Sequence, residues 1–149
     1  NVEIKSENGL RFPGFSKCKA QFEIAVPSGL NLRLAHRKGD VTINGAFNNV
    51  GYDLAAGSIQ FTGSAKKMQV RMAAGSLTIK YDNIQQASLL NIAATAAHIE
   101  VSAPKQTKIA VESNQAASNF NTEFGNSHNP DLSITINAFA SNTNIKKYK

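Results

Sequence analysis

The sequence predicts an all-β protein: a single-stranded β-solenoid or β-roll of about five to six coils, with roughly 20 residues in each coil. Three observations predict this fold. A segment recurs along the chain, apolar and polar residues alternate inside each copy, and a small residue lies at the centre of each copy. Stacked copies would pair one another's backbone groups and bury one shared core. An antiparallel β-sandwich, with a hairpin at each glycine, is the alternative fold.

Composition favours strands over helices and is sufficient for one core. The chain has 149 residues, of which 42% are hydrophobic and only 17% are charged. A helical bundle would need more Leu, Glu and Lys, and a disordered chain would not contain this much Ile, Val, Leu and Phe. Asn, Ser, Thr and Gln supply most of the polar positions, and these residues suit turns and stacked strands.

Residues 1–29 are expected to form an N-terminal strand and cap within the same single domain. Apolar residues alternate over 20–26, as in a half-buried strand, and Pro27, Ser28 and Gly29 end this segment. A cap is expected because an open terminal coil would present unpaired backbone groups to other chains.

Residues 30–149 contain the repeats. Segments 54–61 and 72–79 are nearly identical around Ala-Ala-Gly-Ser, and looser copies precede and follow them. We expect the glycines at sharp corners, because a positive φ costs least in a residue without a Cβ. We also expect the coils to stack in chain order, so that the lysine-rich C-terminus lies at the far end of the rod. The central residues, 18 to 23 positions apart, are Gly39, Gly57, Gly75, Ala97, Ala117 and Ala140.

Four short motifs resemble those of a bacterial adhesin-like family that carries a domain of unknown function. They are Val-Pro-Ser-Gly-Leu at 26–30, Gly-Asp-Val-Thr-Ile at 39–43, Gly-Ser-Ile at 57–59 and Gly-Ser-Leu at 75–77. The resemblance covers roughly residues 20–102. It implies a β-solenoid or β-roll and a setting at the cell envelope or surface, and it transfers no catalytic, cofactor-binding or ligand-binding residue.

The sequence predicts no catalytic, cofactor or metal site. The histidines lack Cys or His neighbours at the spacing of metal ligands, and the lone cysteine has no partner base. Carboxylates occur about once per coil, so no pair suggests the acid and base of a glycoside hydrolase. Nucleophile-elbow, phosphate-loop and zinc-protease motifs do not occur. The residues weighed are His36, His98, His128, Cys18, Asp40, Asp53, Asp82, Glu100 and Glu112.

Charged residues are expected on the outside of the coils. Arg33, Asp53 and Arg71 occupy similar positions in successive copies, which predicts an outward ladder of ion pairs. The net charge is +6. The basic residues are spread along the chain with few aromatics beside them, so a nucleic-acid partner is not predicted, and attraction to anionic glycans or lipid headgroups is the alternative to a simple role in solubility. The dispersed lysines include Lys66, Lys67, Lys105 and Lys108.

These observations predict a non-enzymatic binding module of a bacterial cell surface or envelope, without a cofactor, whose partner is a glycan or a protein. A self-assembling scaffold similar to bactofilin filaments is the second hypothesis, and a polysaccharide-active protein is the third. No apolar stretch is long enough to span a bilayer, so no transmembrane segment is expected. Because the sequence begins at Asn1 without Met, we expect a removed leader and an extracytoplasmic location: secreted, periplasmic or at the cell surface.

Overall fold

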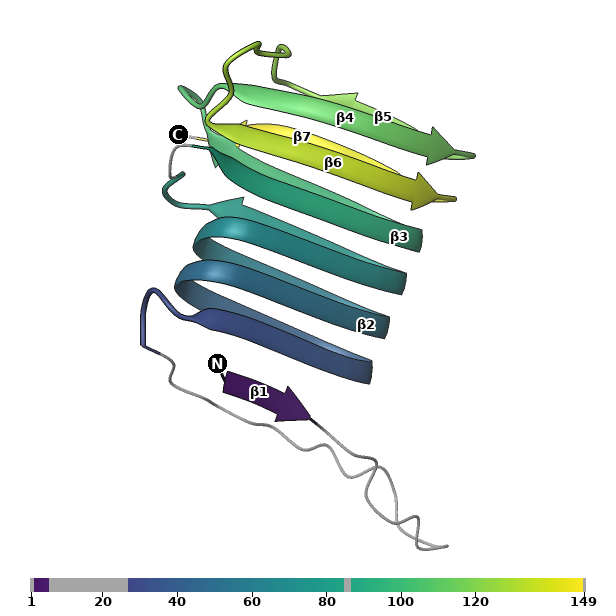
Figure 1. Ribbon diagram of the computed structural model, residues 1–149. Helices are drawn as coiled ribbons and strands as arrows, with labels where there is room; N and C mark the ends of the chain where they lie inside the picture. Colours follow the sequence, from purple (N-terminus) through teal and green to yellow (C-terminus); the bar gives the residue numbers. More distant parts are fainter. Residues whose placement is uncertain (1, 6–26, 85–86, 149) are drawn as a thin grey trace, which may run out of the picture.

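The computed structural model of the chain describes residues 2–5, 27–84 and 87–148, and these residues form one seven-stranded sheet. Every strand pairing in this sheet is parallel. Figure 1 shows the sheet curled, with β2 turning back on itself repeatedly. The all-β prediction is confirmed, and the parallel pairing differs from the antiparallel alternative. The strands are β1 (Val2–Lys5), β2 (Asn31–Tyr81), β3 (Ser88–Pro104), β4 (Ile109–Ala116), β5 (Asn119–Thr122), β6 (Leu132–Phe139) and β7 (Asn142–Tyr148).

Strand β2 is 51 residues long because it continues through its own bends. Residues 18 positions apart lie side by side in it. The Asn49 side-chain amide donates to Asn31 Oδ1 at 2.6 Å, and the Ser58 backbone N–H donates to Asp40 Oδ1 at 3.0 Å. Apolar and polar residues alternate within each turn, so that every second side chain can face the core. The 18-residue spacing of the near-identical sequence segments is therefore the number of residues in one turn of β2.

Glycine makes the bends of β2 possible. Gly39, Gly57 and Gly75 have φ values of 145°, 140° and 130°, which residues with a Cβ rarely adopt. A Cβ placed on Gly57 would lie 1.8 Å from the carbonyl oxygen of Gly39, and one on Gly75 would lie 1.8 Å from that of Gly57. The predicted glycine corners are confirmed. A second glycine column, which was not predicted, stacks Gly63 on Gly45: a Cβ on Gly63 would lie 1.9 Å from the Gly45 carbonyl oxygen.

The later repeats turn their corners differently. Ala117 and Ala140 each have a φ of 51°, and they lie where β4 gives way to β5 and β6 to β7. Ala97, by contrast, pairs with Gly75 inside the continuous strand β3. The Ala97 backbone N–H donates to Ser141 Oγ at 3.2 Å. The predicted corners at Ala117 and Ala140 are thus turns in the left-handed region, whereas Ala97 needs no positive φ.

The last two repeats do not stack in chain order, which corrects the sequence prediction. Ser88 of β3 pairs with Leu132 of β6, and Leu132 also pairs with Ile109 of β4. On the other side of the corner, β7 pairs with both β3 and β5. The C-terminal repeat, formed by β6 and β7, therefore lies between β3 and the β4–β5 repeat. The lysine-rich C-terminus is inside the stack and not at its far end (Figure 1).

Burial explains this order. Leu132, Ile134 and Ile136 of β6 are at most 1% exposed. In β4 the residue paired with Ile136 is Ser113, which is exposed. The repeat with the fully apolar inward face thus occupies the interior position, and the more polar one covers the end, because burying a polar group without a partner is costly.

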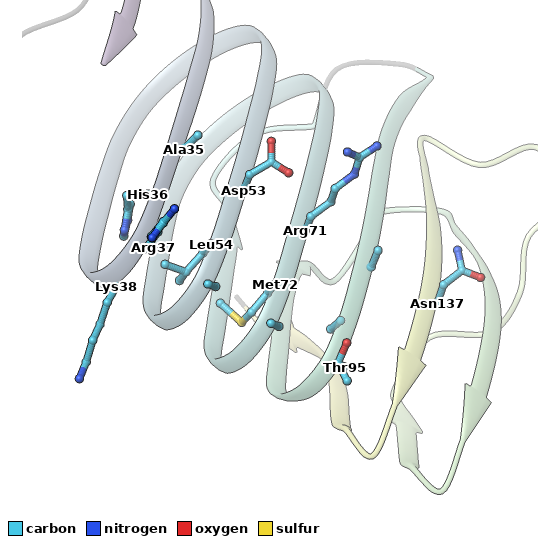
Figure 2. Close-up of a pocket in the computed structure, with 14 residues that line it drawn as sticks. Ala35, His36, Arg37, Lys38, Asp53, Leu54, Arg71, Met72, Thr95 and Asn137 are labelled. Atoms are coloured by element: carbon cyan, nitrogen blue, oxygen red, sulfur yellow. The ribbon is translucent and has the colours of Figure 1, made fainter. Parts of the chain in front are cut away.

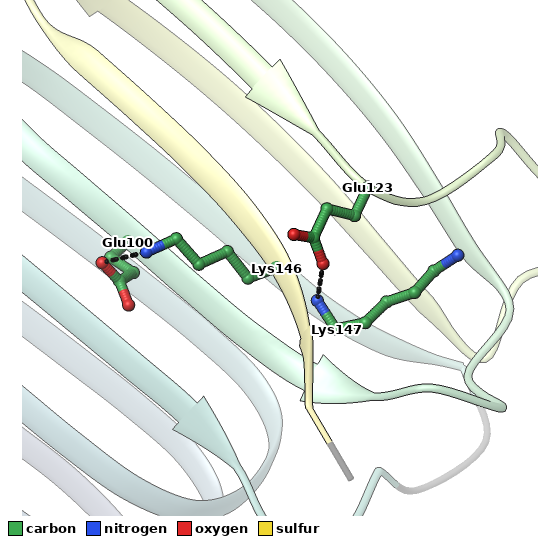
Figure 3. A network of polar contacts seen from close by, with 4 residues as sticks. All are labelled: Glu100, Glu123, Lys146 and Lys147. Atoms are coloured by element: carbon green, nitrogen blue, oxygen red, sulfur yellow. Dashed lines mark hydrogen bonds and ion pairs between the residues drawn. The ribbon is translucent and has the colours of Figure 1, made fainter.

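Polar contacts hold β7 on both sides (Figure 3). Lys146 Nζ lies 3.0 Å from Glu100 Oε2 on β3. The backbone N–H of Lys147 donates to Glu123 Oε2, just beyond β5, at 2.7 Å. The Tyr148 hydroxyl also donates to the carbonyl of Tyr81 at the end of β2.

At the opposite end of the sheet, β1 pairs with β2 from Val2↔Leu32 to Lys5↔Ala35. The N-terminus thus adds a strand beside the first turn of β2. The strand expected over 20–26 lies outside the described residues, and the division between 1–29 and the repeats stays a prediction.

Candidate functional site

The register of the repeats brings distant residues together on the outer face of β2 and β3. Arg71 on the third turn of β2 pairs with Ala93 on β3, and Ala93 pairs with Asn137 on β6. Because one turn of β2 contains 18 residues, Asp53 and Ala35 lie in the same row as Arg71. A second row, two residues further along each strand, contains Arg37, Ala55, Ala73 and Thr95. All of these side chains are exposed except that of Asp53, which is half-buried.

These two rows border an open hollow of about 1150 Å³. Alanines provide much of its lining, so the side chains along the strands are short there. Figure 2 shows Arg37 and Lys38 at one end of the hollow and Thr95 and Asn137 at the other. The alanines in its lining include Ala35, Ala55, Ala73 and Ala93.

The hollow is electropositive. Its lining contains three cationic side chains, those of Arg37, Lys38 and Arg71, and one carboxylate, that of Asp53. Within the part of the chain that the structure describes, Asp53 has one ion-pair partner, Arg33, with Nη2 and Oδ2 4.0 Å apart. The side chains of Arg33 and Asp53 are 73% and 39% exposed, so their attraction is weak. Of the predicted ladder, Asp53 and Arg71 lie in one row, whereas Arg33 lies two residues before that row on the first turn. A single long ion pair, between Arg33 and Asp53, is present among the described residues.

One wall of the hollow is fixed by a contact to the core. His36 Nε2 is hydrogen-bonded to the hydroxyl of Tyr52, and the two rings meet edge to face with centroids 5.6 Å apart. Tyr52 is 2% exposed, and burial raises the pKa of its hydroxyl. A neutral, buried phenol thus orients the His36 ring at the cationic end of the hollow.

An exposed aromatic ring lies beside the other end. Ala94 pairs with Ala138, so Phe139, the next residue of β6, lies alongside Thr95. Phe139 is 57% exposed, the most exposed large hydrophobic side chain among the described residues. A solvent-exposed ring next to a polar hollow suits contact with a partner.

The other residues weighed in the sequence have structural partners or face solvent. Asp40 accepts hydrogen bonds from the backbone and hydroxyl of Ser58, and Glu100 pairs with Lys146. His98 and His128 are exposed. Across the described ranges, no group of three or more His, Cys, Asp or Glu side chains could hold a metal ion. Cys18 lies outside the described residues. The remaining exposed residues of this set are Asp82, Glu112, Lys66, Lys67, Lys105 and Lys108.

Sequence reasoning did not identify the hollow. The sequence did not predict a functional role for Arg37, Lys38 or Phe139, because no motif surrounds them. One signal was available: exposed alanines recur 18 residues apart at Ala55 and Ala73, in a position where charged or polar residues are usual. A row of short side chains on an outer face indicates a place where another molecule can approach the strands.

No known protein family matches the chain, and no curated protein or solved structure gives a match. The resemblance to the adhesin-like family therefore stays a prediction. In the described part of the chain, no helix is long and apolar enough to cross a membrane.

Proposed function

We propose that the protein is a non-enzymatic binding module of a bacterial cell surface or envelope, built as a β-solenoid, with the hollow on β2 and β3 as its ligand site. The observation that carries this proposal is the set of cations at the hollow. Among the described residues, Arg37, Lys38 and Arg71 have no carboxylate partner, although they line one open surface. Within the described lining, three cations beside a single carboxylate leave a net positive charge, which favours an anionic partner.

The lining also supports binding over hydrolysis. A glycoside hydrolase of the usual kind needs two carboxyl groups flanking the bond that it cleaves. In the part of the chain that the structure describes, the lining of the hollow provides one carboxyl group, that of Asp53. The extracytoplasmic setting of this proposal rests on the resemblance to the adhesin-like family.

A glycan microarray with neutral and anionic oligosaccharides tests the proposed function. We expect the protein to bind a subset of glycans, and the Arg71→Ala variant to lose most of that signal. Lys67→Ala is the matched control, because Lys67 is an exposed cation of β2 outside the lining. Equal loss in both variants would indicate nonspecific attraction to the net positive charge and would contradict a site at the hollow.

A self-assembling scaffold is the second candidate, favoured by the open edge of the sheet. The strand order ends at β4, and an unpaired edge can recruit a further strand. Ser113 and Gln115 on that strand are polar residues at positions that are apolar in β6, which favours a cap. Sedimentation velocity over a wide concentration range, followed by negative-stain microscopy, separates the two: filaments would support the scaffold, and a stable small species the binding module.

A further inference from the structure

We propose that the hollow binds a linear polysaccharide that carries carboxylates, with the sugar chain running across the strands from Arg37 to Phe139. This inference rests on the proposed function, since it names the ligand class of the same site. Four properties of the hollow support it: its charge, its hydrogen-bonding groups, its shallow lining and its length.

The charge favours carboxylates on the ligand. Arg37 and Arg71 both present planar guanidinium groups, which bind a carboxylate through two parallel hydrogen bonds. Both side chains are exposed. A ligand with a regular series of carboxylates could engage the two arginines at once, because Arg37 and Arg71 lie on the first and third turns of β2.

The remaining polar groups favour hydroxyls between the carboxylates. Asp53 accepts hydrogen bonds only, whereas the Asn137 amide and the Thr95 hydroxyl can both donate and accept. Asp53 lies on the turn between those of Arg37 and Arg71, and Thr95 and Asn137 lie on the strands beyond Arg71. The hydroxyls of a polyol provide hydrogen-bond donors for Asp53, which an ionised phosphate chain lacks.

The length and depth of the site suit an extended chain. Arg37, Ala55, Ala73, Thr95 and Phe139 occupy one row on five neighbouring turns, about 19 Å from end to end at the usual spacing of strands. The alanines let a sugar ring approach the backbone closely. The exposed face of Phe139 offers an apolar surface to the C–H groups of a sugar at the far end.

Single-stranded nucleic acid fits less well. Such ligands are held by a cationic groove along the backbone and by several aromatic platforms for the bases. Among the residues that the structure describes, one carboxylate lies beside three cations in the lining, and Phe139 is the single exposed phenyl ring next to it. The nucleic acid is therefore the competing outcome of the experiment.

Isothermal titration calorimetry with polygalacturonate oligosaccharides tests this inference, with dextran oligosaccharides and oligo-dT as the other probes. We expect polygalacturonate to bind and to shift backbone amide signals of residues 35–38, 53–55 and 71–73 in NMR spectra. Arg71→Ala should weaken binding about tenfold, the lower end of what the loss of a charge-assisted contact costs, because the Arg71 side chain is exposed to water. Phe139→Ala should weaken it roughly threefold, and Lys67→Ala should leave it unchanged.

Three results would overturn the inference. If dextran binds at the hollow as tightly as polygalacturonate, carboxylates are not recognised, although the proposed binding module stands. If oligo-dT binds more tightly than polygalacturonate, the surface is one for nucleic acid. If no carbohydrate binds and the microarray is also blank, both the inference and the proposed glycan-binding function fail.

Discussion

The two halves of the stack reach the same parallel pairing by different means. In β2 the chain turns at Gly39, Gly57 and Gly75, and each turn lies on the one before it in the chain. In the C-terminal half the corners are at Ala117 and Ala140. The last repeat there lies between β3 and the repeat that precedes it in the chain. Parallel backbone pairing is thus compatible with either order of stacking.

The difference teaches which property sets each arrangement. The corners at Gly57 and Gly75 need glycine for two reasons: the backbone conformation, and the lack of space for a Cβ against the preceding corner. In the C-terminal half no glycine column dictates the order, and the inward-facing residues decide it. Leu132, Ile134 and Ile136 are buried between neighbours, whereas Ser113 faces the open end.

The largest expected effect is an all-or-none test of the stacking order by cross-linking. In a Cys18→Ser background, Ala93→Cys with Asn137→Cys should form a disulfide, because these residues are directly paired and neighbouring strands are about 4.8 Å apart. Peptide mapping by mass spectrometry under non-reducing conditions detects the bond.

The control pair is Ala93→Cys with Asn114→Cys. Asn114 pairs with Asn137, so it lies two strands from Ala93, beyond the reach of a disulfide. Stacking in chain order would reverse the result, since the β4–β5 repeat would then contact β3 directly.

Substitution of a glycine corner should have the next largest effect. Gly57→Ala is expected to destabilise the protein by more than about 4 kcal/mol, because its Cβ would overlap the Gly39 carbonyl oxygen. Gly39→Ala provides the control: its φ is similar, but the nearest heavy atom to its Cβ among the described residues would be 3.8 Å away, on His36. It should cost about 1 to 3 kcal/mol, the strain of the backbone alone. Chemical denaturation measures both, and equal losses would contradict the close stacking of the corners.

A smaller difference is expected between buried valines of the two regions. Val101 on β3 is 0% exposed, and Val111 on β4 is half-buried at the end of the stack. Val101→Ala should cost about 2 kcal/mol and Val111→Ala about half as much, since less apolar surface is lost from the core. Urea denaturation of both variants measures the difference. Equal costs would show that the β4–β5 repeat is packed as tightly as the interior.

The smallest effect is expected from the ion pair between β3 and β7. Glu100→Gln should cost less than about 1 kcal/mol, because both partners are partly exposed, and the loss should shrink in high salt. Glu112→Gln is the control, since Glu112 is exposed and has no ion pair among the described residues. Thermal melts at two salt concentrations measure both. A salt-independent loss would mean that Glu100 acts through packing.

Several features of the fold were predictable because they are local. Alternating side chains predict strands, and glycines 18 residues apart predict corners, since each depends on a few consecutive residues. The near-identity of segments 54–61 and 72–79 also predicts their stacking. For the candidate site, the sequence predicted only that Arg33, Asp53 and Arg71 would be neighbours facing outward.

By itself, the sequence determined that the protein is all-β and where the chain of β2 bends, because both follow from the conformational preferences of single residues. Tertiary structure alone decided that the repeat ending at Tyr148 enters between β3 and β4, and that Arg37 and Asn137 line one hollow. Backbone hydrogen bonding is the same for any pair of parallel strands, so it carries no information about order. The order follows from the total apolar surface that each arrangement buries, which is a property of the whole chain.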